Sequence, residues 1–486
     1  MQEKASSVHE REVKANDAVW QEIRLSDHQK KVQRKLVWKM DFWILSIITV
    51  IYFCNSMDRG DIGYAKVAGM VTDLGFTPNQ FSLIVSIFYA SYILFQPAGT
   101  LLMKKLTPKY ILGGSIIAWG LFTVLMMLVT DVAGAVVLRL CIGMAEAGLQ
   151  AAPLYLSLWY TRREFAARTA VWYSISSIGS VFSGLIAYAL QSSDPSKKYR
   201  PWQLLFLCEG LFPILVGIVT VFFLPEVPEK VKRGFTEEEK EVILIRTNNA
   251  LNTPGSGVTK EGVIAGIKDP HIYFAGFIYG LCLGSSTGFG NFLPSLLNGF
   301  GYTAIRAQLM SVPVNLIAFV SSLFWSWFSD RMAFRGPLIA IFAFLEGIGY
   351  LILLLVTKSI GVQFFACALI SFSSAPFVPL NIAFCLNNVC GHSQRAVALA
   401  VLIMMGQVGG LASGFLYNGP PRYVLGVSSA LGMTATIVIT VCVYDYVLWK
   451  RNKERRLRSN SEKARELRAY SLEAIGSEHP DFYYTL

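Results

Sequence analysis

Long apolar segments recur along almost the whole of this 486-residue chain, and they constrain its fold more than any other feature. A helix of about 20 apolar residues spans the hydrocarbon core of a bilayer, which is about 30 Å thick. Charged residues make up only 15% of the sequence, against about 25% in an ordinary soluble domain. The sequence therefore predicts an all-α membrane protein with twelve transmembrane helices. These are expected at residues 42–62, 81–103, 110–129, 132–157, 170–190, 203–224, 271–293, 307–328, 337–356, 362–386, 396–417 and 424–448.

One long polar segment, residues 225–270, interrupts this series. It is rich in charged residues, which are costly to place in lipid. It divides the helices into six plus six, a layout typical of transporters built from two related halves. The predicted organisation is a cytoplasmic N-terminal tail at 1–40, an N-terminal six-helix bundle at 41–224, a cytoplasmic central loop at 225–270, a C-terminal six-helix bundle at 271–449 and a cytoplasmic C-terminal tail at 450–486.

Two of the predicted helices share a pattern of small residues. The fifth contains Gly179-Ser-Val-Phe-Ser-Gly184, and the eleventh contains Gly409-Gly-Leu-Ala-Ser-Gly414. Small residues four apart let two helix backbones approach closely in a membrane. The repetition favours two pseudo-symmetric bundles, although small-residue packing alone would also produce it.

Basic residues flank the first and the last predicted helix. An excess of Lys and Arg marks the cytoplasmic side, and an even number of helices puts both termini there. The net charge of +11 then faces anionic membrane lipid. Nucleic acid is excluded as a partner, because no aromatic-basic groove or zinc spacing accompanies the basic residues. We expect a multi-pass monomer in the plasma membrane, with an internal membrane as the alternative.

Nothing in the sequence points to catalysis or to a metal. The eight cysteines lie in or beside apolar segments without a Cys-x-x-Cys pair, as small buried hydrophobes do. No metal cluster, nucleophile elbow or phosphate loop is present. The protein is predicted not to be an enzyme and to use no cofactor other than a proton gradient.

Four charged residues lie within the predicted membrane helices of the first half: Asp58 and Arg59 in the first helix, and Arg139 and Glu146 in the fourth. Charges at such positions are costly and are functional candidates by default. Arg139 and Glu146 share one helix face but lie about 10.5 Å apart along the axis, too far for direct pairing. Gln150 follows one turn later on the same face. Each charge therefore needs a partner on another helix, in water or in a substrate.

The four charges are neutral together when all are ionised, which suggests a coupling mechanism. Burial favours the protonated form of a carboxyl group. A proton on Asp58 or Glu146 would release Arg59 or Arg139 to bind a substrate carboxylate in forked geometry. We hypothesise that the protein carries an organic anion together with a proton. The alternative is an internal salt-bridge network that only holds the two helices together.

The second half is expected to supply shape and hydrogen bonds to the pocket. Asn381 and Gln407 are candidate substrate ligands, because an amide within lipid still seeks a partner. Glu209 and Glu346, which also lie within apolar segments, are interpreted as helix-packing residues. Asp330 and Arg331 lie at the cytoplasmic edge and are predicted to take part in gating, together with Arg168 at the start of the fifth helix.

These features resemble the major facilitator superfamily and, more narrowly, the fungal anion:cation symporter family of allantoate permease-like proteins. The resemblance covers roughly residues 38–450. It rests on the following motifs: Met57-Asp58-Arg59 with Ile62-Gly63-Tyr64-Ala65, Arg139-x3-Gly143-x2-Glu146-Ala-Gly148, Trp159-Tyr160-Thr-Arg-Arg-Glu164, Leu224-Pro225-Glu-Val-Pro228 and Pro421-Arg422-Tyr423.

The resemblance implies a twelve-helix major facilitator fold, alternating access and proton-driven uptake of small organic anions such as ureides, nicotinate, pantothenate, biotin or sulfur-containing acids. It also implies protonation at Asp58 and Glu146, with Arg59 and Arg139 serving the anion. Two departures stand out. Asp61 replaces the asparagine that is usual in the family, and Met103 replaces an aspartate of the superfamily.

Two other functions remain open. A proton-coupled exporter would usually carry a Gly-Pro motif in the fifth helix, where this chain has Gly179–Gly184 without proline. A non-transporting nutrient sensor on the same fold would tend to have a long cytoplasmic extension, whereas the two tails predicted here are short.

Overall fold

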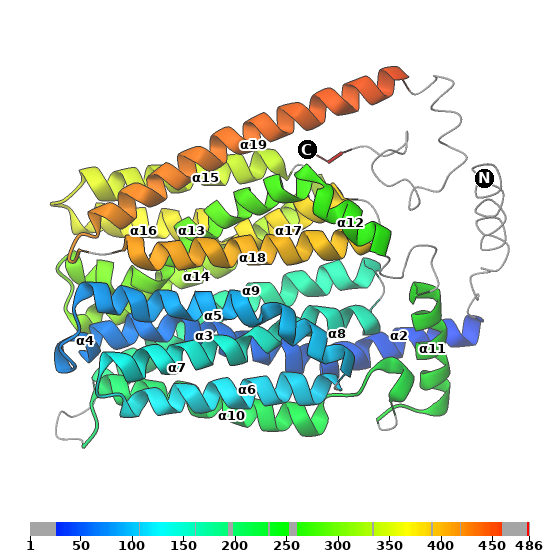
Figure 1. Cartoon of the computed structure of the whole chain (residues 1–486), viewed down its shortest axis with the longest axis horizontal. Coiled ribbons are helices and arrows are strands. Elements are labelled where there is room, and N and C mark those ends of the chain that lie inside the picture. The colour runs from blue at the N-terminus through cyan, green and yellow to red at the C-terminus, as the bar shows by residue number, and fades with distance from the viewer. Residues whose placement is uncertain are drawn as a thin grey trace.

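The computed structural model describes residues 26–105, 107–160, 162–192, 198–231, 234–251, 260–332, 335–389, 392–417, 419–458 and 484–485. Nearly all of these residues are helical, and the helices run side by side along one common direction (Figure 1). Most of the two predicted tails lies outside the described residues.

The N-terminal half contains six membrane-spanning elements. The first continues from α2 (Asp27–Met40) through a π-helical turn, η1 (Asp41–Leu45), so the helix begins well before residue 42. The predicted fourth helix is interrupted by a 3₁₀ turn, η3 (Ala147–Gln150). The six elements are α3 (Ser46–Val67), α5 (Pro78–Lys105), α6 (Pro108–Leu125) with η2 (Met126–Leu128), α7 (Val132–Glu146) with α8 (Ala151–Trp159), α9 (Arg162–Gln191) and α10 (Pro201–Phe223).

The C-terminal half repeats this arrangement. Its predicted fourth helix, 362–386, is broken at Pro376, whose ring cannot continue the hydrogen-bonding pattern of the preceding helix. Its last helix continues ten residues beyond the predicted end at residue 448. The elements are α13 (Pro270–Gly299), α14 (Ala304–Met332), α15 (Gly336–Leu355), α16 (Ile360–Ser374) with α17 (Phe377–Asn387), α18 (His392–Leu416) and α19 (Val424–Arg458).

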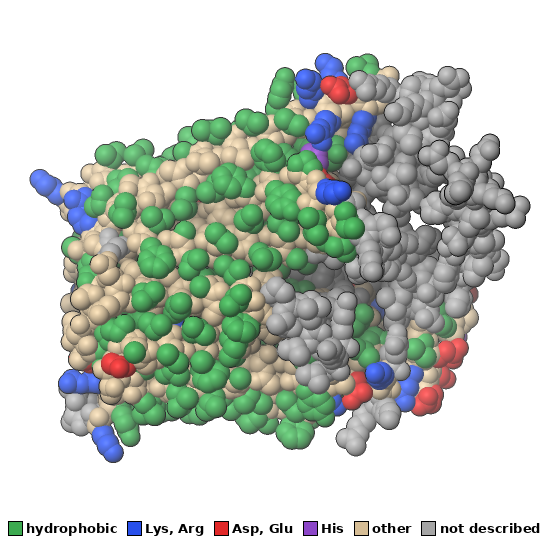
Figure 2. All heavy atoms as spheres, viewed as in Figure 1, with side chains coloured by type: hydrophobic (Ala, Val, Ile, Leu, Met, Phe, Trp, Pro, Cys, Tyr) green, Lys and Arg blue, Asp and Glu red, His purple; other side chains and the backbone are tan. Residues whose placement is uncertain are grey.

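Eleven helices within the described residues are long and apolar enough to cross a membrane. The twelfth is α9, which has 30 residues and an apolar part at Ile178–Gln191. Large apolar side chains such as Phe222, Leu94 and Leu355 are mostly exposed, which is expected where lipid replaces water. Charged side chains gather at the two ends of the molecule, and apolar ones cover the band between (Figure 2). The prediction of an all-α, twelve-helix membrane protein is confirmed.

The central segment contributes three short helices at one end of the bundle: η4 (Pro228–Lys230), α11 (Glu237–Leu251) and α12 (Lys260–Lys268). Both α2 and the C-terminal part of α19 project from this end (Figure 1). We call it the tail end. The opposite end carries the short helix α4 (Met70–Asp73) and the loops at 198–200, 300–303, 356–359 and 419–423.

The two halves pack through matching pairs of helices: α3 with α13, α5 with α18, and α9 with α14. The small residues of the sequence pattern lie in these contacts. A Cβ atom on Gly184 of α9 would meet Oγ of Ser311 on α14 at 2.9 Å, and one on Gly410 of α18 would meet the Tyr89 ring on α5 at 2.9 Å. The repeated pattern thus marks equivalent contacts between the halves, as pseudo-symmetric bundles require.

Hydrogen bonds between the halves lie away from the tail end. Tyr64 Oη is 2.9 Å from Ser311 Oγ, and Asn291 Nδ2 donates to Tyr89 Oη at 3.1 Å. Lys66 Nζ donates to Tyr423 Oη at 2.9 Å. We call these contacts the inter-half seam. Within the described residues, the halves are therefore closed against each other toward the end opposite the tails.

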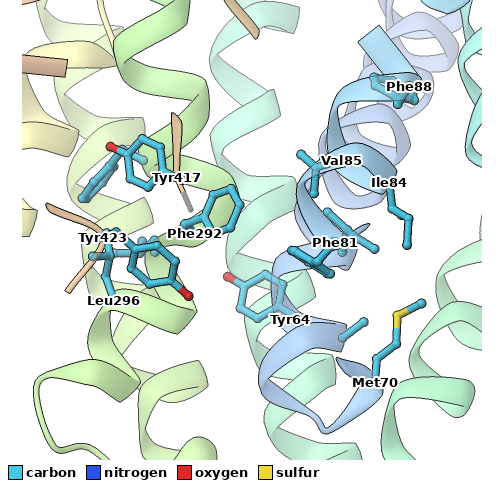
Figure 3. Close-up of a cluster of buried hydrophobic side chains, with 14 of the residues drawn as sticks. Tyr64, Met70, Phe81, Ile84, Val85, Phe88, Phe292, Leu296, Tyr417 and Tyr423 are labelled. Carbon is cyan, nitrogen blue, oxygen red and sulfur yellow. The ribbon is translucent and has the colours of Figure 1, made fainter. Parts of the chain in front are cut away.

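Aromatic side chains from both halves fill this seam (Figure 3). The Lys66 ammonium lies over the rings of Phe81, Phe292 and Tyr423, at 4.6, 4.8 and 5.0 Å from the ring centres. Phe81 belongs to the N-terminal half, and the other two rings belong to the C-terminal half. Such cation–π contacts are strongest where water is excluded, so Lys66 ties the halves together by charge as well as by its hydrogen bond.

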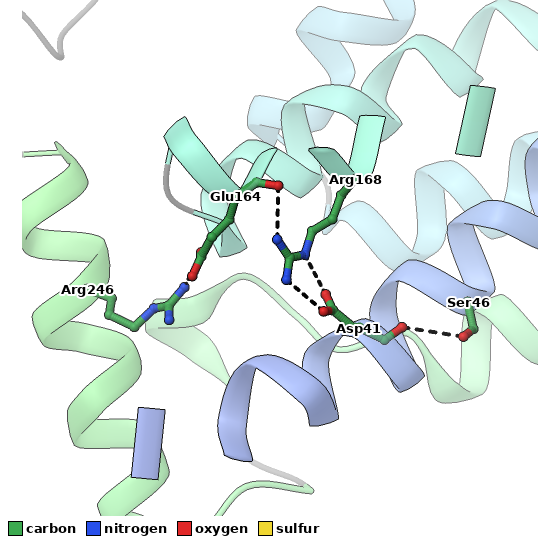
Figure 4. A network of polar contacts seen from close by, with 5 residues as sticks. All are labelled: Asp41, Ser46, Glu164, Arg168 and Arg246. Carbon is green, nitrogen blue, oxygen red and sulfur yellow. Dashed lines mark hydrogen bonds and ion pairs between the residues drawn. The ribbon is translucent and has the colours of Figure 1, made fainter. Parts of the chain in front are cut away.

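A polar network at the tail end has a different role (Figure 4). Arg168 Nε and Nη2 donate to the two carboxylate oxygens of Asp41 at 2.5 and 2.7 Å. Arg246 of α11 pairs with Glu164 at 2.5 Å, and Lys39 pairs with Glu239 at 2.6 Å. These contacts fasten α2, α9 and the central segment together. The described partners of Arg168 all belong to the N-terminal half.

The forked Asp41–Arg168 pair should stabilise the N-terminal half. Both side chains are mostly buried, so Asp41→Asn and Arg168→Leu are each expected to lower the free energy of unfolding by about 1–3 kcal/mol. The double variant should cost little more than either single change, because the two residues serve one interaction. Chemical denaturation of the purified protein measures all three; additive costs would contradict a shared interaction.

Candidate functional site

The first pair of charges joins α3 to α7. Glu146 is the last residue of α7, and its side chain is fully buried. Its Oε1 accepts hydrogen bonds from Nε and Nη2 of Arg59 at 3.1 and 2.9 Å, and another from Nδ2 of Asn55. Asn55 and Arg59 are one helical turn apart, so one face of α3 presents both donors. The side chain of Arg59 is still 30% exposed, which leaves one side of the guanidinium accessible.

Close helix packing puts Glu146 at this position. Gly143 lies three residues earlier on α7, and a Cβ atom there would run into the backbone carbonyl of Phe88 on α5. Gly148 similarly meets Ser115 of α6. Because these glycines have no side chains, α7 lies directly against α5 and α6. The carboxylate is thereby brought to the face of α3 that carries Arg59.

A second group of charges contacts α6 and α10 of the N-terminal half. Asp58 is buried, and its Oδ1 accepts a hydrogen bond from Thr123 of α6 at 2.7 Å. Arg139 of α7 interacts electrostatically with Asp58 and with Asp61. Its guanidinium lies 5.9 Å from the ring centre of Phe206 on α10. Arg139 and Glu146 thus each interact with a charge on another helix, Asp58 and Arg59 of α3.

The site holds a fifth ionisable side chain, Asp61. It is fully buried, and neither carboxylate oxygen has a hydrogen-bond partner among the described residues. In the sequence it stood out only as a departure from a family pattern. Helical spacing places it one turn beyond Asp58, on the same face of α3.

Aromatic rings of α5 form another wall around Arg59. The guanidinium carbon lies 5.4 Å from the ring centre of Tyr92 and 5.7 Å from that of Phe88. Tyr89 on the same helix accepts the hydrogen bond from Asn291 of α13. The C-terminal half thus reaches the site through Asn291.

Sequence reasoning missed Asn55, Thr123 and the α5 rings as parts of this site. The spacing of four residues between Asn55 and Arg59 was a usable signal, because both then face one neighbour. Thr123, Phe88 and Tyr92 offered none, since hydroxyl and aromatic residues are common on membrane helices and only packing reveals their partners.

The remaining predicted ligands lie elsewhere or outside the description. The Gln150 side chain is not among those described. Asn381 donates to the Phe377 carbonyl of its own helix at 2.8 Å and contacts Cys282 of α13. Gln407 is buried and lies one turn before Gly410, on the face of α18 that meets α5. Of these residues, Gln407 is therefore the one directed toward the N-terminal half.

Two of the predicted gating residues, Arg168 and Arg331, have described side chains, and these make separate contacts. Arg168 is held in the tail-end network, whereas Arg331 is exposed and its guanidinium carbon lies 4.3 Å from the ring centre of Trp327. The side chain of Asp330 lies outside those described. Among the described residues, no group of three His, Cys, Asp or Glu side chains could hold a metal ion.

Comparison with known families decides the class of protein. Residues 48–414 match the Major Facilitator Superfamily. The chain belongs to this family. It is 34% identical over 464 residues to a Schizosaccharomyces pombe protein described as an uncharacterized transporter, with 94% of each chain covered. It is 28% identical to the high-affinity nicotinic acid transporter of Saccharomyces cerevisiae, covering 93% of this chain and 85% of that one.

Solved structures support the same fold. A bacterial homologue of the human lysosomal transporter Spinster superposes with a TM-score of 0.65 at 15% sequence identity, covering 83% of this chain and 96% of that one. This major facilitator protein is therefore a multi-pass membrane transporter with a small-molecule substrate, and it is not an enzyme.

Proposed function

We propose that this transporter is a proton-coupled symporter that imports a small organic anion by alternating access, as a member of the fungal anion:cation symporter family. The observation that carries the proposal is the Arg59–Glu146 pair. A partly exposed guanidinium is held by a fully buried carboxylate, and an anion that took the place of Glu146 would find the same donors.

Protonation of Glu146 allows the substrate anion to replace this residue as the partner of Arg59. A proton on Glu146 removes the charge that holds Arg59, because a neutral carboxyl attracts a guanidinium far less than a carboxylate does. A substrate carboxylate then binds the freed donors of Arg59, and the site with its bound anion again carries no net charge. The faces of Phe88 and Tyr92 lie beside the guanidinium and suit a flat or apolar substrate body. Asp58 and Arg139 form a second acid–base pair for the same purpose.

The basic residues at the tail end and the closed inter-half seam together indicate how the protein is oriented in the membrane. Basic residues concentrate beside α2 and α19 at the tail end, which favours a cytoplasmic tail end. The inter-half seam then closes the external side, and the state seen here faces the cytoplasm. In this proposal both termini are cytoplasmic, the membrane is the plasma membrane, the protein acts as a monomer surrounded by lipid, and the proton gradient replaces any cofactor.

An uptake screen tests the substrate class. The similarity to a nicotinic acid transporter makes labelled nicotinate the first probe, followed by pantothenate, biotin and allantoate. Cells lacking their own carriers should accumulate one of these anions, and a protonophore or Arg139→Ala should abolish accumulation. Net efflux from preloaded cells under an inward proton gradient would instead show an exporter, and binding without flux would show a sensor.

The Glu146→Gln variant tests the coupling step. Wild-type uptake should rise as the external pH falls, because Glu146 must be protonated before Arg59 is free. Glutamine imitates the protonated acid and cannot titrate, so uptake by Glu146→Gln should depend less steeply on external pH than wild-type uptake does. Glu346→Gln removes a buried carboxyl of the C-terminal half and should keep the wild-type pH dependence. A steep, wild-type pH profile in Glu146→Gln would exclude Glu146 as the coupling acid.

A further inference from the structure

Asp61 is the carboxylate of the charge cluster that the fold does least to stabilise. Glu146 accepts hydrogen bonds from Arg59 and Asn55, and Asp58 accepts one from Thr123. Asp61 is as deeply buried, yet both of its oxygens lack a hydrogen-bond partner among the described residues. A buried carboxyl group without hydrogen-bond partners is costly when it is ionised. It is therefore expected to be neutral or to have a functional role.

The number of acidic and basic groups in the cluster also indicates that Asp61 is neutral. The cluster contains three carboxyl groups, Asp58, Asp61 and Glu146, and two guanidinium groups, Arg59 and Arg139, so full ionisation leaves one negative charge. Arg59 is hydrogen-bonded to Glu146. Arg139 is left with two carboxyl groups and can neutralise one of them. Thr123 favours the charged form of Asp58, so Asp61 is the group that holds a proton in this state.

Among the described residues, Arg139 is the one positive charge that interacts with Asp61. The titratable groups that interact with it are Asp58 and Tyr64 on its own helix and Arg139 on α7. Glu209 of α10 is buried and also acidic. The contacts that α9, α13 and α14 make with this part of α3 come from neutral groups: the Ser183 hydroxyl, the Asn291 backbone and the Ser311 hydroxyl.

The position of Asp61 also connects it to the seam. Two residues later, Gly63 touches the backbone of Asn291, and one residue further Tyr64 contacts Ser311. Opening of the seam would separate α3 from α13 and α14 and admit external water beside Asp61. Asp58 lies one turn closer to the tail end along the same helix face. The two acids form a short path along α3 from the external side toward the Arg59–Glu146 pair.

We propose that Asp61 is a second proton-binding site, loaded from the external side when the seam opens and emptied toward the cytoplasm through Asp58. This inference rests on the proposed symport function and extends it: two protons, one on Glu146 and one on Asp61, accompany each monovalent anion. The net movement is one positive charge inward per cycle.

The number of protons and the net charge moved with each anion test this proposal. The purified transporter in lipid vesicles is given labelled nicotinate, and uptake is measured under a fixed proton gradient with and without an inside-negative potential. The wild type should show two protons per anion from reversal potentials and faster uptake with the potential. Asp61→Asn should show one proton per anion and no response to the potential. Glu346→Gln should keep the ratio of two. A ratio that is the same in wild type and Asp61→Asn would overturn the proposal.

Infrared spectroscopy of the purified protein supplies a readout that needs no substrate. A protonated carboxyl group gives a carbonyl-stretch band, and the wild-type spectrum should contain a component of this band that is missing in Asp61→Asn. If Asp61→Asn does not transport, loss of this band supports the proton site and an unchanged spectrum overturns it. If the wild type moves no anion but the band disappears in Asp61→Asn, the proton site stands and the symport function fails.

Discussion

Replacing Arg59 with leucine is expected to abolish anion uptake and to destabilise the protein. The change removes both charged donors to Glu146 and leaves that carboxylate buried. Breaking a buried pair in this way costs about 3–5 kcal/mol, and we expect the lower end because Arg59 is 30% exposed. Loss of a charge-assisted contact to the substrate costs about 2–5 kcal/mol. Uptake should therefore fall at least about 30-fold.

A double variant separates the two effects. In Arg59→Leu/Glu146→Leu no charge of the pair remains unpaired, so stability should return to near the wild-type value. Uptake should stay lost, because the anion still has no guanidinium to bind. Thermal unfolding of the purified proteins and uptake in cells are measured on the wild type, Arg59→Leu and the double variant. Recovery of uptake in the double variant would mean that the pair is only structural, which is the alternative reading of the four charges.

The helices and their charges could be predicted from the sequence because both follow from local composition. Long apolar runs specify membrane helices, and an arginine within one of them stands out without any knowledge of the fold. The pairing of α3 with α7 was also within reach, since Arg139 and Glu146 need partners on a neighbouring helix.

What the sequence could not show depends on contacts between distant segments. Thr123 becomes a partner of Asp58 only because α6 packs beside α3. The ring of Tyr92 on α5 contacts Arg59 on α3, and no local pattern in the sequence indicates that these two residues meet. Asn381 was a reasonable candidate ligand as an amide within lipid, yet its hydrogen bond goes to its own helix. A buried amide needs a partner, and the sequence does not say which one.

Substitution of Gly63 by alanine is expected to shift the transporter away from the cytoplasm-facing state. A Cβ atom at this position would run into the carbonyl oxygen of Asn291 and lie 3.1 Å from its carbonyl carbon. The obstacle is the backbone of the other half, which cannot rotate away as a side chain would. Overpacking of this kind costs about 1–3 kcal/mol. Because the contact exists only while the seam is closed, the cost falls on one state of the cycle.

A free-energy change of about 1–3 kcal/mol alters a two-state equilibrium roughly 5- to 150-fold. The substitution Ser311→Cys, made in a background whose native cysteines are replaced by serine, reports whether the inter-half seam is open. A membrane-impermeant thiol reagent added outside intact cells should label it faster in Gly63→Ala than in the parent, and uptake should fall because the cycle stalls with the seam open. Gly290→Ala is the matched control, since Gly290 lies beside Asn291 but has no atom within 4 Å of its Cβ position. Equal labelling rates in Gly63→Ala and Gly290→Ala would mean that the α3–α13 contact does not separate during transport, and the proposed entry of protons to Asp61 through the seam would then have no route.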